Sequence, residues 1–186
     1  MLTLASRSPQ RKAILEQLGI EFRVEPADVE ELTEGDPAHV VTENAVRKAR
    51  AVDGELVLGA DTEVFLDDRI YGKAETGKEA ERYLRSLSGR THEVWGGIAL
   101  REGDDVRTGH AVTRVTFAQL DDTRIEWYLA TGEWRDRAGA YAIQGRGSAL
   151  VEGIEGDFWN VVGLPVPELL RLAPGLLARN PSGADS

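Results

Sequence analysis

The chain has 186 residues, with 22 lysines and arginines against 32 aspartates and glutamates, which gives a net charge of −10. A chain of this length buries about 70% of the surface that its unfolded form exposes, so it can fold as one domain without covalent or metal cross-links. The absence of cysteine excludes disulfide frameworks, thiolate nucleophiles, cysteine-bound zinc and iron–sulfur clusters. The acidic balance argues against nonspecific binding to nucleic acid polymers or anionic membranes. It leaves room for a phosphorylated small molecule held by a few placed cations and a metal ion.

The predicted elements alternate between helices and strands. Helix starts are indicated by Ser8-Pro9 and Asp36-Pro37, which each place a capping residue before a proline, and by a capping box at residues 76–79. In chain order we expect a strand at 2–6, a helix from 9 to about 18, a strand at 20–24, a helix at 37–49, a strand at 56–61, a hairpin at 64–71, a helix at 77–87, strands at 92–100 and 106–117, a helix from 122, a strand at 148–152 and a final helix after 165. This mixture predicts an α/β or α+β domain built on a mixed sheet.

Domain limits and location follow from what the ends of the chain contain. The first residues carry neither the basic region nor the long apolar region of a signal peptide, and no apolar run approaches the roughly 20 residues that span a bilayer. We therefore expect a cytoplasmic protein without a membrane partner. Residues 1–173 are expected to form a single domain, and residues 174–186, rich in Pro, Gly and Ser, a frayed tail. Trp127, on the helix after 122, is expected in the core.

The first segment that could carry chemistry is the strand–loop–helix at residues 6–12. The start of a helix offers unpaired N–H groups and partial positive charge, which together bind anions. Arg11 and Lys12 lie in the first helical turn, where a cation opposes the helix dipole unless an anion neutralises it. These residues favour a phosphate site, although an ordinary capped helix with solvated basic side chains would have the same sequence.

Two acidic segments could bind a metal ion. The apolar strand at 56–61 ends in Asp61, which would place a carboxylate at the edge of the sheet where α/β proteins bind ligands. Asp61 could ligate a divalent cation or act as a base, and Glu30 could supply a second carboxylate, since Mg²⁺ takes one or two carboxylates together with phosphates and water. A turn-capping aspartate and a solvated acidic loop are the structural alternatives.

Two further features would complete a nucleotide site. Lys48 and Lys73 are separated cations that could converge on phosphates, or simply be surface lysines. Gln144 follows a run of small residues and offers both a donor and an acceptor, as the edge of uracil or thymine does. A tight loop packed by Tyr141 would explain the same segment.

Together these segments resemble the Maf family of nucleotide pyrophosphatases over nearly the whole chain. The matching motifs are residues 4–11 (LASRSPQR), 28–31 (DVEE), 59–62 (GADT), 72–73 (GK), 87–94 (LSGRTHEV), 138–145 (AGAYAIQG) and 162–165 (VGLP). Each motif alone is weak, but their number and order make the resemblance specific and favour the functional interpretation of every segment.

The resemblance implies a fold, a reaction and residue roles. The fold would be a mixed α/β structure with two lobes around a deep cleft, related to the inosine-triphosphate pyrophosphatases and often homodimeric. The reaction would convert a nucleoside triphosphate to the monophosphate and pyrophosphate with a divalent cation, Mg²⁺ or Mn²⁺. By motif, Asp61 resembles the catalytic proton acceptor, and Glu30 resembles a second acidic position that would ligate metal together with Asp61. Phosphate contacts fall on Ser6, Arg11, Lys48 and Lys73, and base choice is associated with Gln10, Thr62 and Gln144.

The late motif also implies a substrate. Its IQG form resembles the branch that acts on dTTP and UTP, whereas the 7-methyl-GTP branch has Glu at the position of Gln144. Two residues depart from the family pattern: Gln10 stands where Arg is usual, and Arg137 where Lys is usual. Because glutamine cannot reproduce the arginine fork, a pyrophosphatase for CTP, 7-methyl-GTP or another modified nucleotide stays an alternative. A nucleotide-binding regulatory factor linked to cell division is a further one, and pyrophosphate release would discriminate between them.

Overall fold

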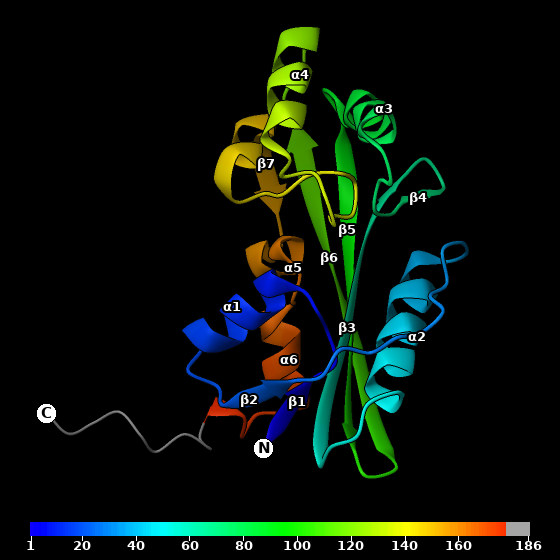
Figure 1. Cartoon of the computed structure of the whole chain (residues 1–186), viewed down its shortest axis with the longest axis vertical. Coiled ribbons are helices and arrows are strands. Elements are labelled where there is room, and N and C mark those ends of the chain that lie inside the picture. Colours follow the sequence, from blue (N-terminus) through cyan, green and yellow to red (C-terminus); the bar gives the residue numbers. More distant parts are fainter. Residues whose placement is uncertain (178–186) are drawn as a thin grey trace, which may run out of the picture.

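A computed structural model describes residues 1–177 of the chain (Figure 1). Its elements are, in chain order, β1 (Leu2–Leu4), α1 (Pro9–Gln17), β2 (Phe22–Val24), α2 (Pro37–Arg50), β3 (Leu56–Leu66), β4 (Arg69–Tyr71), α3 (Gly77–Leu87), β5 (Thr91–Glu102), β6 (Asp105–Phe117), α4 (Asp122–Thr131), the 3₁₀ helix η1 (Gly145–Leu150), β7 (Val151–Glu155), α5 (Phe158–Val162) and α6 (Val166–Leu172).

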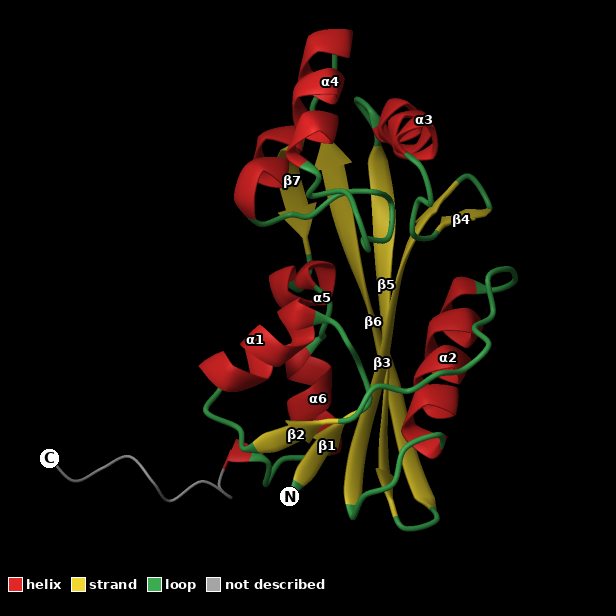
Figure 2. Cartoon of the chain, viewed as in Figure 1, coloured by secondary structure: helices red, strands yellow, loops and turns green. Residues whose placement is uncertain are grey.

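One mixed sheet organises these elements (Figure 2). Its seven strands follow the order β2-β1-β3-β5-β6-β7, with β4 paired to the upper part of β3. β1 runs parallel to both β2 and β3, and the remaining pairs are antiparallel. The prediction of a mixed α/β fold is therefore confirmed.

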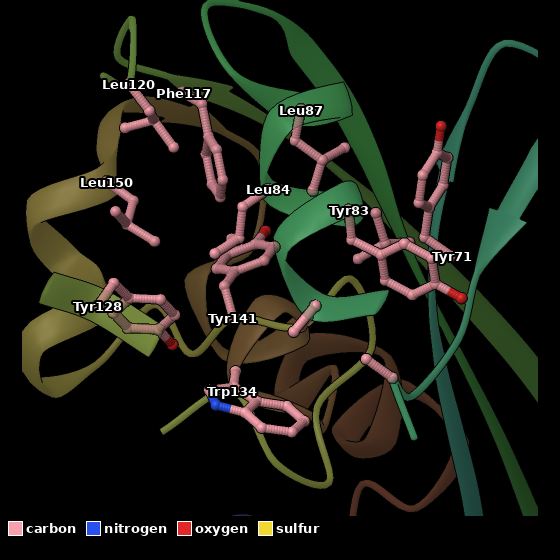
Figure 3. Close-up of a cluster of buried hydrophobic side chains, with 14 of the residues drawn as sticks. Tyr71, Tyr83, Leu84, Leu87, Phe117, Leu120, Tyr128, Trp134, Tyr141 and Leu150 are labelled. Atoms are coloured by element: carbon pink, nitrogen blue, oxygen red, sulfur yellow. The ribbon is translucent and has the colours of Figure 1, made fainter. Parts of the chain in front are cut away.

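Three long strands, β3, β5 and β6, run through two lobes (Figure 1). In the lower lobe, α1 and α6 pack on one face of the sheet over an aliphatic core, while α2 packs on the other face over a smaller core of alanines and valines. The upper lobe has its own aromatic-rich core, in which side chains of α3, β6 and residues 134–150 point toward one another (Figure 3).

Two glycines bring α2 close to the sheet. A Cβ atom at Gly59 of β3 would overlap the carbonyl oxygen of Ala45, and one at Gly97 of the neighbouring strand would overlap that of Val41. Gly59 and Gly97 lie on β3 and β5, which pair along most of their length. Because glycine lets two backbones approach closely, the inner face of α2 lies directly against the residues of β3 that follow Gly59.

The structure differs from the predicted elements at four places. β3 does not end at Asp61 but continues to Leu66, since the residues beyond Asp61 keep their pairing with β5. The strand expected at 148–152 is shifted: η1 occupies 145–150 and β7 begins at Val151. Trp127 is 45% exposed, so its expected place in the core is wrong. Of the predicted tail, Leu176 is buried against the lower core, and residues 178–186 lie outside the described part.

Over residues 1–177, no helix is both long enough and apolar enough to cross a membrane.

The upper core holds a histidine that makes stability depend on pH. His92 is 1% exposed, its Nε2 lies 2.8 Å from the hydroxyl of Tyr141, and its Nδ1 is buried without a partner in the described structure. Burial lowers the pKa of His92 from 6.5 to about 4. As the pH falls below 6.5 the unfolded chain binds this proton first, so the free energy of unfolding falls until about pH 4 and then levels off.

We predict that His92→Gln makes the free energy of unfolding less dependent on pH. Between pH 6.5 and 4 the parent should lose about 3 kcal/mol more stability than the variant, because 1.36 kcal/mol accompanies each pH unit between the two pKa values. Urea unfolding at several pH values measures it, with the exposed His39 changed to Gln as the control. Parallel pH curves for the parent and His92→Gln would show that His92 does not titrate as described.

Candidate active site

A cavity of about 1050 Å³ lies between the two lobes. Its lower wall comes from the end of β1, the start of α1, α2 and the middle of β3, and its upper wall from β4, α3 and residues 135–141. The residues predicted from sequence that line it are Ser6, Gln10, Arg11, Lys48, Asp61, Thr62 and Lys73. The topology explains the gathering: β1 stops at Leu4 while its neighbour β3 continues, and the chain turns away at Ala5, whose N–H donates to Leu58 O.

Asp61 is held by two side chains of α2. Its Oδ1 accepts from Lys48 Nζ at 2.7 Å and its Oδ2 accepts from Asn44 Nδ2 at 2.9 Å. The Asp61 residue is 4% exposed, Lys48 8% and Asn44 is wholly buried. A buried carboxylate requires such partners, because an unpaired one costs several kcal/mol. The close approach of α2 at Gly59 and Gly97 places these partners within reach.

Two further carboxylates lie beside Asp61. Ligand atoms of Glu31, Asp61 and Glu63 all fall within 4.8 Å of one another. Glu63 shares a face of β3 with Asp61, since successive strand residues alternate sides. Glu31 comes from the acidic loop after β2 and forms an ion pair with Lys48 Nζ at 3.0 Å.

The acidic loop also contains Glu30, which the sequence predicts as a metal ligand. Glu30 is exposed and does not belong to the carboxylate group; its backbone carbonyl oxygen accepts from Arg47 Nη1 at 2.9 Å. Adjacent residues of an extended loop point in different directions, and it is the side chain of Glu31 that meets Asp61. Glu31 thus lies beside Asp61 where Glu30 was expected, and the role of Glu30 as a metal ligand stays a prediction.

The carboxylate cluster fits a hard divalent cation. Burial and the negative charges of Asp61 and Glu31 raise the pKa of Glu63 to about 8, against the opposing effect of Lys48 and Lys73. Glu63 Oε2 is buried and has no hydrogen-bond partner among the described residues. Oxygen ligands of this kind, crowded and short of positive charge, are those that Mg²⁺ and similar ions use. These three residues can therefore hold a metal ion.

Arg11 is a buried cation whose described hydrogen bonds all go to neutral oxygens. Its guanidinium donates to Gly163 O at 2.9 Å, to Ser6 Oγ at 3.0 Å and to Thr62 Oγ1 at 3.2 Å. Burial lowers the pKa of Arg11, and the charges of Asp61, Glu31 and Glu63 oppose this effect. Its positive charge faces the cavity and is available to an anionic ligand.

Lys73 lies on the opposite wall. It follows β4, pairs with Ala138 through a single backbone bridge and is exposed. Lys73 lines the cavity, and its positive charge partly offsets the rise in the pKa of Glu63. Arg11 and Lys73 thus bring positive charge from both lobes, whereas Lys48 is already paired with Asp61 and Glu31.

A smaller pocket of about 260 Å³ adjoins the cavity and contains Gln10 and Gln144. Gln10 lines both spaces and accepts from Ser8 Oγ at 3.1 Å. Gln144 is exposed and precedes η1, and its side chain makes no capping hydrogen bond there. Thr62 does not line this pocket; it contacts Arg11 within the larger cavity. The structure therefore brings together two of the three residues expected to choose the base.

Asn44 and Glu63 were not among the predicted site residues, although each carries a periodic signal. Glu63 follows Asp61 by two residues, the strand period that places both on one face. Asn44 precedes Lys48 by four residues, the helix period that does the same. Both signals depend on knowing that the strand continues past Asp61 and that α2 packs on that face.

Comparison with known proteins agrees with the geometry. Residues 1–175 match the family described as Maf-like protein. The chain is 47% identical to a dTTP/UTP pyrophosphatase of Symbiobacterium thermophilum, with 92% of this chain and 91% of the relative covered. It is 48% identical to one of Anaeromyxobacter sp. (92% and 87% covered) and 44% identical to one of Pyrococcus furiosus (92% and 93% covered). The chain belongs to the Maf family.

Glu31 and Glu30 form a matched pair for testing the metal site. We expect Glu31→Gln to weaken Mn²⁺ binding roughly tenfold or more, since a charged contact contributes about 1.5–3 kcal/mol. Glu30→Gln should leave binding unchanged within a factor of about two, below 0.5 kcal/mol. The rise in melting temperature of EDTA-treated protein with added MnCl₂ measures both. The reverse order of effects would mean that Glu30, and not Glu31, faces the ion.

Proposed function

We propose that this chain hydrolyses dTTP and UTP to the monophosphate and pyrophosphate, using Mg²⁺ or Mn²⁺. The observation that carries the proposal is a pair of adjoining spaces, which share lining residues and contain three chemically distinct regions. The carboxylate cluster lines the larger space, Arg11 and Lys73 lie on its two walls, and the smaller pocket beside it contains the amides of Gln10 and Gln144. A metal ion, a triphosphate and a pyrimidine base need these three regions next to each other.

The carboxylate cluster would serve the reacting phosphorus. A divalent cation bound by Glu31, Asp61 and Glu63 would supply a Lewis acid that polarises a phosphate oxygen. Asp61 would accept the proton of the attacking water, and Lys48 and Asn44 keep its carboxylate in one orientation for that transfer. Glu31 in place of Glu30 is part of this proposal.

The cations would bind the phosphates. Arg11 is oriented by Ser6, Thr62 and Gly163, so its guanidinium is fixed before the substrate arrives. Lys73 would reach the phosphates from the other lobe, and the hydroxyl of Ser6 can still donate one hydrogen bond. Contacts to charged groups contribute about 1.5–3 kcal/mol each, and they offset the repulsion between the acidic protein and an anionic substrate. They also stabilise the charge that develops on the leaving pyrophosphate.

The base would lie in the smaller pocket. The amides of Gln144 and Gln10 each provide a donor and an acceptor, which matches the N3–H and O4 groups of thymine and uracil. This assignment agrees with the dTTP/UTP names of the three relatives. A nucleotide is the partner proposed here, and a homodimer stays a prediction.

The decisive assay is pyrophosphate release from dTTP, UTP, CTP, GTP and 7-methyl-GTP with Mg²⁺ or Mn²⁺. We expect turnover of dTTP and UTP, and a fall in kcat of roughly 10²–10⁴ in Asp61→Asn, the usual contribution of a positioned proton acceptor. Asp28→Asn is a matched control, because Asp28 lines the same cavity outside the carboxylate cluster. Nucleotide binding without pyrophosphate release would instead indicate a regulatory binding protein.

Gln144→Glu tests base recognition separately from chemistry. The carboxylate keeps the acceptor but loses the donor, so an acceptor of the pyrimidine is left unpaired at a cost of about 1–3 kcal/mol. We expect kcat/KM for dTTP to fall about tenfold or more, with Mn²⁺ affinity unchanged. Gln17→Glu, an exposed change on α1, adds the same charge as a control. An unchanged kcat/KM in Gln144→Glu would remove Gln144 from the base pocket.

A further inference from the structure

The side-chain amide of Asn44 forms hydrogen bonds with two separate parts of the site, Asp61 and the backbone of Leu32. Its Nδ2 donates to Asp61 Oδ2 at 2.9 Å and to the carbonyl oxygen of Leu32 at 3.0 Å, while its Oδ1 accepts from the N–H of Leu32 at 2.7 Å. The Leu32 N–H can only donate, so the amide orientation is fixed by chemistry. Asn44 is 0% exposed, and a buried amide with all three of these bonds satisfied has one stable rotamer.

The contact with Leu32 places the acidic loop. Three consecutive loop residues are held by three residues of α2: Arg47 binds the carbonyl oxygen of Glu30, Lys48 binds the carboxylate of Glu31, and Asn44 binds both backbone groups of Leu32. The loop has no helix or strand of its own at these positions. The side chain of Glu31 reaches the cluster because α2 holds the residues on both sides of it.

Among the described residues, Asn44 is the one neutral side chain that joins this loop to Asp61. Lys48 also contacts both Asp61 and Glu31, but an ammonium group on a flexible side chain can bind them in many geometries. Arg47 contacts the loop without touching Asp61. The planar amide of Asn44 instead fixes the distance between a backbone segment and a carboxylate oxygen, one residue away from Glu31.

We propose that Asn44 is a positioning residue that sets Asp61 and Glu31 at the separation a divalent cation requires before the ion binds. The inference rests on the proposed function only for the statement that the ion serves catalysis. Removing a residue that orients metal ligands typically weakens metal affinity by about 10–100-fold. Asn44→Leu keeps a similar volume in a helix and removes all three hydrogen bonds.

The experiment measures Mn²⁺ binding to metal-free full-length protein by the electron paramagnetic resonance signal of free Mn²⁺, without nucleotide. We expect Asn44→Leu to raise the Kd for Mn²⁺ about 10–100-fold, and amide hydrogen exchange at residues 28–34 to accelerate. Arg47→Ala is the matched control: it loosens the same loop but leaves the Asp61 contact, and its Kd should stay within about threefold of the parent, less than 0.7 kcal/mol. If Asn44→Leu does not fold, as judged by circular dichroism, Asn44→Ala replaces it.

Two results would overturn the inference. A folded Asn44 variant with a Kd for Mn²⁺ close to that of the parent would show that the amide only stabilises the fold. An equal loss in Arg47→Ala would assign the effect to the loop and not to the Asp61 contact. Since no substrate is present, the outcome stands whether or not the chain hydrolyses dTTP; failure of the proposed function appears separately, as absent pyrophosphate release by the parent.

Discussion

The buried ion pair between Lys48 and Asp61 is the constraint on which the cleft depends. A carboxylate in the middle of a central strand has little access to solvent, so the fold must bring it a cation and a hydrogen-bond donor. α2 supplies both, at 2.7 and 2.9 Å. It can do so because Gly59 and Gly97 leave no side chains between the helix and the sheet. A larger residue at either glycine would separate the helix from the strand and leave Asp61 unpaired.

The same region contains unbalanced charges of both signs, which a bound metal ion and substrate would neutralise. Three carboxylates lie together with one buried ammonium, and burial together with the charges of Asp61 and Glu31 raises the pKa of Glu63 to about 8. On the other side, Arg11 is buried among neutral oxygens. A metal ion relieves the first excess and a phosphate relieves the second. An excess of negative charge next to an unpaired positive charge is typical of functional sites, where local interactions are left unsatisfied until the ligand binds.

The sequence predicts the helices and strands better than it predicts the tertiary contacts between them. Caps at Ser8, Asp36 and Thr76 start helices as expected, because their side chains accept from backbone N–H groups of the first turn. Asp61 looked like the end of a strand because a charged residue followed an apolar run. The tertiary contact with α2 overrides that signal, since it stabilises a charge inside the sheet. The choice between Glu30 and Glu31 depends in the same way on which backbone groups α2 holds, and no residue pattern records that.

The continuity of β3, β5 and β6 through both lobes bears on how the protein admits its ligand. β3 contributes Leu56, Leu58 and Ala60 to the lower core, Asp61 to the cavity, and Val64 and Leu66 to the upper core without a break. Opening the lobes would bend three strands that are hydrogen-bonded to each other along most of their length. These strands therefore oppose a change in the distance between the two walls of the cavity. Under the proposed function, adapting this scaffold to bulkier bases would require smaller side chains along the walls of the cavity instead of a longer hinge.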